Sequence, residues 1–415
     1  MPERLKPEAG AGGGAVLVAM GAVFLSLVGF GIVVPLLPFY RDVFGASAWE
    51  VTLMSSVFAA GQFFGELFWG RLSDRIGRKP IIIATILFSG LGYVALAYAP
   101  TMGAAIAARA VSGFFCGNIS TIQGYIVDVS PRDRLAGRLG MIGSAFGIGF
   151  IVGPTLGGLL ARPELGVAGF RPPLLAAAGL CAMAVVCTFL FVRESGRRQD
   201  SSAGKSRPVG ADVVRRTLSD TILRRYVAAT FLSFGGFSAM FSTFGLWGAA
   251  RFDWGPRDIG MVLAFTGIAS AASQGLVSGW ASRRIGEANT AIIGLSVAAM
   301  FLLAEAFGPP ATVAAIIIVG VTIFHTLSQP AGVTLVSRAA PDDEQGATLG
   351  VNNAASAAAR VLGPMSGGLL FSLFGESSPF LLAPICMVAA ALMTWSGSRE
   401  TRRRRLAEEG LPAGD

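Results

Sequence analysis

The sequence predicts an all-α membrane protein with twelve transmembrane helices, arranged as two pseudo-twofold six-helix bundles. Three observations support this fold class: an apolar composition, regularly spaced apolar stretches and an internal repeat. Of the 415 residues, 53% are hydrophobic and only 14% are charged, which lies well outside the range of soluble globular proteins. Water is therefore not the main solvent of this chain.

The apolar stretches are long enough to cross a bilayer, since a spanning helix needs about 20 apolar residues. No charged residue lies between Ala9 and Tyr40, a stretch too long for the apolar core of a cleavable signal peptide, so we expect a retained first span. The predicted spans are 15–39, 49–70, 80–99, 102–128, 136–161, 172–192, 226–250, 257–280, 289–306, 311–336, 347–373 and 378–397.

The second half of the chain repeats the first. The segment Gly153-Pro154-Thr155-Leu156-Gly157-Gly158-Leu159-Leu160 returns 210 residues later as Gly363-Pro364-Met365-Ser366-Gly367-Gly368-Leu369-Leu370. Gly70, Ser73, Arg75, Ile76 and Gly77 pair with Gly279, Ser282, Arg284, Ile285 and Gly286 at a spacing of 209. Many secondary transporters are built from duplicated multi-helix halves with a substrate site between the repeats, so the repeat predicts transport.

Cationic residues predict the orientation, because Lys and Arg accumulate in cytoplasmic loops. If both termini are cytoplasmic, the tails and inner loops hold 26 of the 33 Lys and Arg residues. The opposite side holds only Arg41, Arg162, Arg171, Arg251 and Arg257. The net charge of +8 therefore follows from orientation in the membrane, and we expect no nucleic-acid partner.

We expect five segments along the chain. They are a cytoplasmic tail (1–14), a six-helix bundle (15–192), a cytoplasmic linker (193–225), a second bundle (226–397) and a cytoplasmic tail (398–415). From Val209 the linker either forms a short basic amphipathic helix on the membrane surface or is simply solvated. The excess of Arg over Lys and the abundance of Ala and Gly are typical of a GC-rich bacterial genome, which suggests the bacterial cytoplasmic (inner) membrane.

The stretch Gly70-Arg71-Leu72-Ser73-Asp74-Arg75-Ile76-Gly77-Arg78-Lys79-Pro80 resembles the signature loop of the major facilitator superfamily. Gly70 and Gly77 allow a tight turn, and Asp74 can face a helix N-terminus or an arginine. The alternative is a plain cationic inner loop. The resemblance extends from Leu17 to about Ser396 and implies the major facilitator fold.

Two further motifs resemble those of the same superfamily. Arg109-Ala110-Val111-Ser112-Gly113 is similar to its intramembrane arginine motif, which implies a role in proton coupling or in organising the cavity; a purely structural hydrogen-bonding role is the alternative. Gly149, Gly153, Pro154, Gly157 and Gly158, repeated as Gly363 and Pro364, look like the motif of its antiporters. Small residues there also predict a packing seam between helices.

Gly29-Phe30-Gly31-Ile32-Val33-Val34-Pro35-Leu36-Leu37-Pro38 is similar to the first helix of twelve-helix drug:proton antiporters, including tetracycline and multidrug exporters. By that resemblance, a conformational latch between the halves holds the outward-open state, with Asp74 near the start of the eleventh helix. Its members are Gly70, Asp74, Arg75, Gly77, Arg78 and Asp128. In the second half Arg283 replaces Asp74 and Glu287 replaces Arg78, so we expect an asymmetric latch.

The proton-carrying group is the least specified part of the site, because the first span contains no acid. The candidates for proton coupling are Glu66, Arg109 and His325. Glu66 either exchanges a proton in the inner leaflet or is an interfacial, solvated or arginine-paired acid. His325 either titrates near physiological pH or remains a neutral histidine bonded to a backbone carbonyl. Glu305 lies close to an outer helix end, where it can be solvated.

The resemblance also implies a substrate cavity lined by the first, fourth, seventh and tenth helices. Sparse polar contacts are expected from Asn118, Gln123, Gln329, Asn353 and Arg360, and an adaptable apolar wall from Phe237 and Phe241. For each aromatic residue, lipid contact or core packing is the alternative.

These observations predict a secondary active transporter, most specifically a proton-coupled antiporter that exports small lipophilic compounds or drugs by alternating access. A proton symporter or facilitator for a specific metabolite is the alternative. The single histidine and the lack of a Gly-x-Ser-x-Gly motif argue against an enzyme. We expect a small-molecule substrate, protons and the lipid bilayer as partners, no cofactor or metal, and a monomer.

Overall fold

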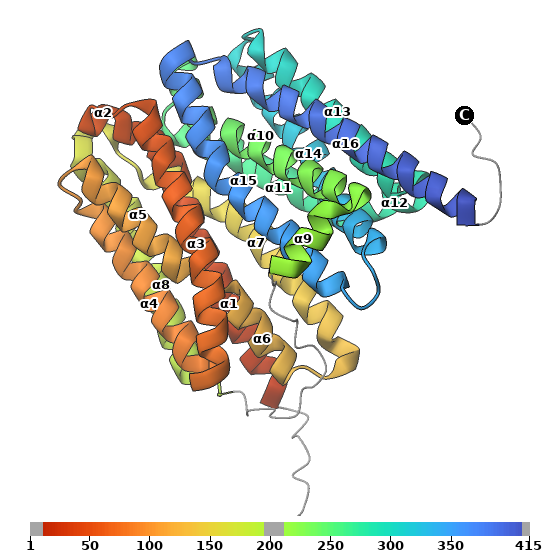
Figure 1. Cartoon of the computed structure of the whole chain (residues 1–415). Helices are drawn as coiled ribbons and strands as arrows, with labels where there is room; N and C mark the ends of the chain where they lie inside the picture. The colour runs from red at the N-terminus through yellow and green to blue at the C-terminus, as the bar shows by residue number, and fades with distance from the viewer. Residues whose placement is uncertain (1–10, 195–210, 409–415) are drawn as a thin grey trace, which may run out of the picture. The chain divides into compact units, whose positions relative to one another are not determined.

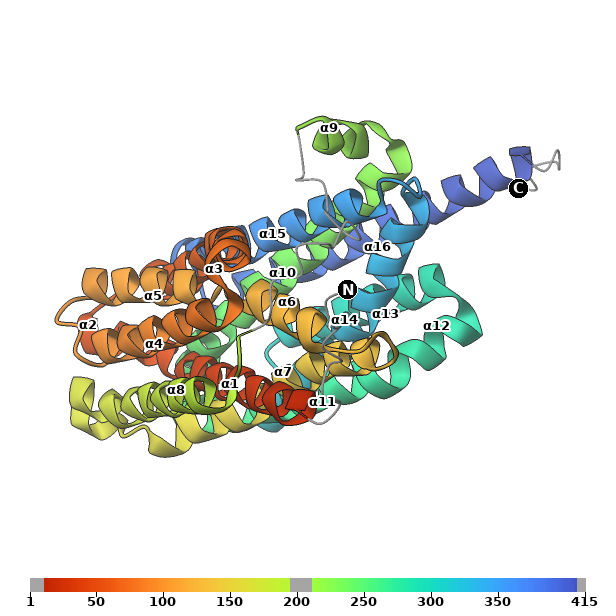
Figure 2. The same cartoon turned by 90° about the horizontal axis from the view of Figure 1, so that it is seen from below.

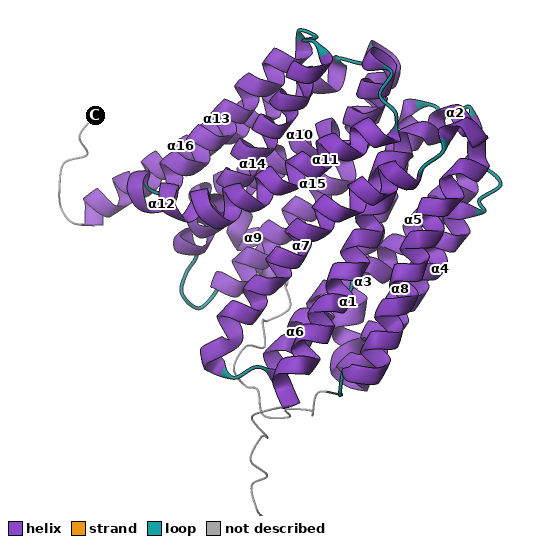
Figure 3. Ribbon diagram, turned by 180° about the vertical axis from the view of Figure 1, so that it is seen from behind, coloured by secondary structure: helices purple, strands orange, loops and turns teal. Residues whose placement is uncertain are grey.

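The computed structural model describes residues 11–194 and 211–408, and within these ranges every regular element is a helix (Figure 3). Residues 1–10, 195–210 and 409–415 lie outside the described residues, and with them most of the predicted N-terminal tail, part of the linker and the end of the C-terminal tail. The all-α fold class is confirmed.

The helices of the first half are α1 (Ala11–Val33), a 3₁₀ segment (Val34–Phe39), α2 (Tyr40–Phe44), α3 (Ala48–Ile76), α4 (Arg78–Ala97), α5 (Met102–Cys116), α6 (Ile119–Val129), α7 (Arg132–Leu160), a 3₁₀ segment (Pro163–Phe170) and α8 (Arg171–Phe191). Then come α9 (Ala211–Ser219), α10 (Thr221–Phe252), α11 (Pro256–Ala272), a π-helical segment (Ser273–Ser278), α12 (Gly279–Ile285), α13 (Glu287–Ala306), α14 (Ala311–Ala339), α15 (Gln345–Phe374) and α16 (Ser378–Glu408). The described end of the linker contains a helix, α9, and its position on the membrane surface stays a prediction.

In the described residues, 11 helical segments are long and apolar enough to cross a membrane, and they cover every predicted span except the fifth. The predicted fifth span, 136–161, lies in α7, whose apolar part is Gly147–Leu160. The chain is therefore a multi-pass membrane protein, in agreement with the prediction of twelve membrane helices.

Two predicted spans are not continuous α-helices. The first changes to a 3₁₀ segment after Val33, because Pro35 and Pro38 lack the N–H groups that the α-helical ladder needs. The fourth is broken between α5 and α6, where Gly117 has φ −73° and ψ 41°. A Cβ on Gly117 would lie 2.5 Å from the Gln62 carbonyl oxygen, so α5 meets α3 backbone to backbone at this break.

Contacts divide the chain into two compact units. Unit 1 comprises residues 1–44, 57–200 and 255–264, and unit 2 comprises residues 45–56, 201–254 and 265–415. Within unit 1, α1 packs on α7 and α8, and α4 packs on α5 and α8 (Figure 1). Within unit 2, α10 packs on α15 and α16, and α13 packs on α14 and α16 (Figure 2).

The internal repeat is visible in a glycine seam within each unit. A Cβ on Gly153 of α7 would lie 2.7 Å from the Val28 carbonyl oxygen of α1. A Cβ on Gly363 of α15 would lie 2.6 Å from the Gly235 carbonyl oxygen of α10. Val28 and Gly235 are 207 residues apart, so each residue of α1 corresponds to the residue of α10 that lies 207 positions later.

The last glycine of each repeated motif also has an equivalent environment. Gly158 packs on the Pro256 carbonyl of α11, within unit 1, at a Cβ distance of 2.5 Å. Gly368 packs on Thr52 of α3, within unit 2. The fifth helix of the first half, α7, therefore contacts the first turn of α11, and the fifth helix of the second half, α15, contacts the first turns of α3. Both α3 and α11 are the second helix of their half, so the two contacts are equivalent in the duplicated fold.

Candidate functional site

The turn between α3 and α4 is built on Gly77. This residue has φ 110° and ψ 155°, a conformation that L-residues with side chains rarely adopt, so α3 ends at Ile76 and α4 begins at Arg78. The prediction of a loop from Gly70 to Pro80 is wrong, since α3 is helical to Ile76 and only Gly77 leaves the helical conformation. The turn places Asp74 and Arg78 side by side.

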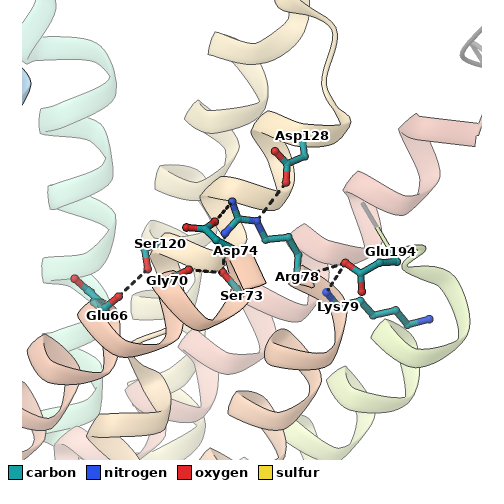
Figure 4. Close-up of polar contacts among 9 residues, drawn as sticks. All are labelled: Glu66, Gly70, Ser73, Asp74, Arg78, Lys79, Ser120, Asp128 and Glu194. Atoms are coloured by element: carbon teal, nitrogen blue, oxygen red, sulfur yellow. Dashed lines mark hydrogen bonds and ion pairs between the residues drawn. The ribbon is translucent and has the colours of Figure 1, made fainter. Parts of the chain in front are cut away.

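Arg78 joins three side chains in this turn (Figure 4). Its Nη2 lies 2.7 Å from Asp74 Oδ1, its Nε donates to Asp128 Oδ2 over 3.2 Å, and its Nη1 donates to Ser73 Oγ over 2.6 Å. The Arg78 side chain is only 17% exposed, so these charge-assisted hydrogen bonds form partly away from water. They connect the end of α3 to the end of α6.

Glu194, just after α8, completes this group and was not anticipated from the sequence. Its Oε1 accepts hydrogen bonds from the backbone N–H of Arg78 at 2.8 Å and of Lys79 at 3.3 Å (Figure 4). A carboxylate is favoured there because the first N–H groups of α4 carry partial positive charge and lack helical partners. We call Ser73, Asp74, Arg78, Asp128 and Glu194 the Arg78 cluster.

Glycines leave the space that the Arg78 cluster occupies. A Cβ on Gly77 would lie 2.8 Å from Glu194 Oε2, and one on Gly124 would lie 2.6 Å from Arg78 Cζ. The carbonyl oxygen of Gly70 accepts a hydrogen bond from Ser73 Oγ at 2.7 Å. Small residues on α3 and α6 are therefore as necessary for this cluster as its charges.

Of the predicted latch residues, the structure brings Asp74, Arg78 and Asp128 together within unit 1. Arg75 lies on the last turn of α3 and is exposed. The predicted position of Asp74 beside the eleventh helix concerns unit 2 and remains a prediction.

The equivalent turn of the second half keeps one ion pair and reverses its charges. Gly286 has φ 82° and precedes Glu287, which occupies the place of Arg78 in the repeat. Arg338 lies 210 residues after Asp128, and its Nη2 is 2.8 Å from Glu287 Oε1. The Arg338 side chain is 62% exposed, so this pair is closer to water than the Arg78 cluster.

Arg109 is the buried cation of unit 1. It lies on α5, is 2% exposed, and its Cζ is 4.1 Å from the centroid of the Phe58 ring and 6.0 Å from that of Phe30. Its Nε and Nη1 have no hydrogen-bond partner among the described residues. A cation in this environment is costly, on the order of 2.5–3.5 kcal/mol on insertion scales, so a functional reason for its presence is expected.

Glu66 is half-buried on α3, and its backbone carbonyl accepts a hydrogen bond from Ser120 Oγ at 3.3 Å. In Figure 4 its side chain points away from Arg78. The structure therefore does not add Glu66 to the Arg78 cluster.

His325 is the centre of a buried polar group in unit 2. Its Nε2 lies 3.2 Å from Ser233 Oγ and 3.0 Å from Gln329 Nε2, which in this amide orientation donates to the ring and puts the ring proton on Nδ1. Phe237 stacks on the imidazole at 4.0 Å and 4°. Nδ1 is buried and has no hydrogen-bond partner among the described residues.

The other predicted cavity residues fall in several environments. Asn118 is buried and donates to Thr85 Oγ1 at 2.8 Å, which ties α6 to α4. Phe241 stacks on Phe237 at 5.7 Å. Gln123, Asn353 and Arg360 are exposed. The described residues contain no group of three His, Cys, Asp or Glu side chains placed to hold a metal ion.

Glu305 is not solvated, contrary to the sequence-based expectation. It lies in the last turn of α13 with 1% exposure, and neither carboxyl oxygen has a hydrogen-bond partner among the described residues. The sequence missed this burial because α13 packs on both α14 and α16, which only the tertiary structure shows.

The sequence profile described as "Major Facilitator Superfamily" matches residues 19–364 and again residues 322–413. This chain belongs to the major facilitator superfamily. The chain is 29% identical to a class C tetracycline resistance protein of Escherichia coli over 388 residues, which is 92% of each sequence. It is 24% identical over 383 residues to multidrug resistance protein 2 of Bacillus subtilis, covering 91% of this chain and 94% of that protein.

Solved structures agree on this fold. A bacterial homologue of the human lysosomal transporter Spinster, in an inward-facing and occupied conformation, superimposes with a TM-score of 0.78 at 16% identity. The match covers 92% of this chain and 96% of that structure. The protein is thus a major facilitator transporter of the membrane, and the recognition made from its sequence motifs is confirmed.

Proposed function

We propose that this major facilitator protein is a proton-coupled antiporter that exports small lipophilic compounds or drugs by alternating access. The observation that carries the proposal is the similarity, over more than nine-tenths of the chain, to tetracycline and multidrug resistance proteins. The glycine seam between α1 and α7 supports it, because its residues match the antiporter motif. No covalent chemistry is needed, so the protein would not be an enzyme.

Coupling requires groups that bind protons or respond to them, and Glu66, Arg109 and His325 are the candidates. Arg109 and His325 are both 2% exposed and each has nitrogen atoms without hydrogen-bond partners among the described residues. In the proposal, the Arg78 cluster acts as the latch of the outward-open state through Asp74. The protein would work as a monomer in the bacterial cytoplasmic membrane, with both termini cytoplasmic.

Everted membrane vesicles test the proposal. Adding a substrate from a tetracycline, quinolone and cationic-dye panel should collapse an imposed pH gradient, and Glu66→Gln, Arg109→Gln and His325→Ala should reduce the collapse at unchanged expression. If the folded protein dissipates no gradient with any compound of the panel, antiport is wrong.

A proton symporter or facilitator for one metabolite is the second candidate. The absence of acidic residues from the first span favours it, because that acid is part of the pattern in drug:proton antiporters that the sequence resembles. Uptake of one compound down an inward proton gradient, without gradient collapse by drugs, would establish this alternative.

A further inference from the structure

Arg109 is the only cation among the fully buried residues of unit 1, and nothing in the described residues neutralises it. No carboxylate lies within 4 Å of its guanidinium among the described side chains, and its Nε and Nη1 have no acceptor. A buried donor without an acceptor keeps the desolvation cost of its burial. A structural arginine would be expected to have found acceptors, so the unmet hydrogen bonds point to a ligand.

The surroundings of Arg109 are aromatic on several sides. Phe30 of α1 lies 5.0 Å from the Phe58 ring of α3 and 5.8 Å from the Phe150 ring of α7, with the guanidinium 4.1 Å from Phe58. We call Arg109 and these three phenylalanines the Arg109 site. The distance of 6.0 Å between Arg109 and Phe30 is at the limit of cation–π attraction, so the guanidinium attracts the Phe30 ring less strongly than the Phe58 ring.

The second half has an aromatic residue at the equivalent place. Phe237 lies 207 residues after Phe30, which is the spacing that relates α1 to α10, and it covers the nitrogen-containing ring of His325 at 4.0 Å. In unit 1, Phe30 of α1 lies beside the buried Arg109 of α5, and in unit 2, Phe237 of α10 lies over the buried His325 of α14. The repeat kept the aromatic residue, whereas Ile318 or Val319 stands at the position equivalent to Arg109, and His325 lies elsewhere on α14.

We infer that the Arg109 site binds the anionic group of a planar aromatic substrate. The guanidinium donates Nε–H and Nη1–H to the acid or enolate oxygens, and the substrate's ring takes the place of Phe30 against Phe58. This inference rests on the proposed transport function and names its substrate class. Purely cationic lipophilic compounds would gain nothing at this site, because they would meet a like charge in a low-dielectric environment.

Three probes that share a naphthalene ring system and differ in charge test the inference: naphthalene sulfonate, naphthamide and naphthylmethyl-trimethylammonium. The measurement is the unfolding temperature of the full chain in lipid nanodiscs, since a ligand that binds the folded state raises it. The sulfonate should raise it most and the ammonium least. Arg109→Gln should weaken sulfonate binding by at least about tenfold while binding of naphthamide changes little.

Controls separate this role from a structural one. Arg171→Gln removes another arginine that stacks on an aromatic ring, Tyr98 at 4.9 Å, but at an exposed position, and it should leave sulfonate binding unchanged. Without ligand, Arg109→Gln should unfold at the same or a higher temperature than the unmodified protein, because an uncompensated buried charge is removed. If this variant unfolds too readily for binding to be measured, Arg109 is structural and the inference is wrong.

Phe58→Leu provides a second variant that keeps the charge, and it should weaken binding of the sulfonate and of naphthamide by a similar factor. Sulfonate binding that survives Arg109→Gln, a stronger response to the ammonium probe, or no response to the sulfonate at all would overturn the inference. Export of cationic drugs with gradient collapse in that case would leave the proposed function intact. Loss of gradient collapse with every compound would instead count against the proposed function.

Discussion

The turn between the second and third helices of the first half and its equivalent in the second half have the same backbone and different chemistry. Both begin with a glycine at positive φ, Gly77 at 110° and Gly286 at 82°. In the first half Arg78 contacts Asp74, Asp128 and Ser73, whereas in the second half Glu287 contacts Arg338 with the charges reversed. Duplication has preserved the path of the chain and one ion pair, and only one copy has become a crowded cluster.

The buried charges of the two units differ in the same way. Unit 1 buries the cation Arg109 without an acceptor at Nε or Nη1, and unit 2 buries the acid Glu305 without a donor, among the described residues. Neither charge has a counterpart of the same type at the equivalent position of the other half. For Arg109, the equivalent residue is Ile318 or Val319. Backbone packing tolerates such divergence because helix contacts are made by glycines and apolar side chains, while charges act through specific neighbours.

The largest expected effect is at Arg78. Arg78→Ala removes the guanidinium that bonds to Asp74, Asp128 and Ser73, and we expect a loss of about 3 kcal/mol in the free energy of unfolding together with loss of transport. Thermal unfolding in nanodiscs and drug-dependent gradient collapse would measure both. Arg71→Ala, which removes an exposed cation near the end of α3, is the control and should be close to neutral. Equal effects of the two variants would mean that the cluster does not stabilise unit 1.

The next-largest loss of stability is expected when Gly77 or Gly286, the glycine of each turn, is replaced by alanine. Gly77→Ala introduces both backbone strain and a clash with the Glu194 carboxylate, whereas Gly286→Ala introduces strain alone, because no atom lies within 4 Å of its added Cβ. We expect about 1–2 kcal/mol for the strain in each variant, and a clearly larger loss for Gly77→Ala. If unfolding shows the two variants to be equal, Glu194 does not pack on this turn.

The reversed pair should matter less. Since Arg338 is 62% exposed, a double-mutant cycle of Glu287→Ala and Arg338→Ala should give a coupling of roughly 0.2–1 kcal/mol that falls at high salt. The same cycle on Arg78 and Asp128 should give a larger, less salt-sensitive value. A coupling in the second half that matches the first would remove the distinction between the two turns.

An effect of similar size is expected at Asp220, which caps α10. Partial burial raises its pKa, but hydrogen bonds from the N–H groups of Leu223 and Ile222 and from Arg404 outweigh this, so that its pKa in the folded protein is lowered. Asp220→Ala should cost about 1 kcal/mol at neutral pH. A depressed pKa stabilises the fold above the unfolded value of about 3.9, and this contribution is lost as the pH falls through the folded value. The difference between the variant and the unmodified protein should therefore shrink below about pH 4; a constant difference would contradict the lowered pKa.

Individual residues show how far sequence patterns reached. The glycine spacing of 210 residues predicted the seams of α7 and α15, because close approach of two helices requires the small residues themselves. The break of the fourth span at Gly117 was not predicted, since its cause is the backbone of α3 at Gln62, some 55 residues earlier in the chain. Likewise Glu194 and the reversed partner Arg338 each meet a residue that is distant along the chain.

The sequence by itself determined the membrane-crossing segments, the duplicated architecture and the family. Apolar length and motif spacing can be recognised along the chain without knowing which residues meet in space. Tertiary structure alone decided which charges are paired and which are buried. Arg78 is surrounded by acceptors, whereas among the described residues Arg109 has no acceptor at Nε or Nη1 and Glu305 has no donor to its carboxyl oxygens. The physical reason is that the energy of a charge depends on its neighbours and on its distance from water, and both are set by helices that are far apart in the sequence.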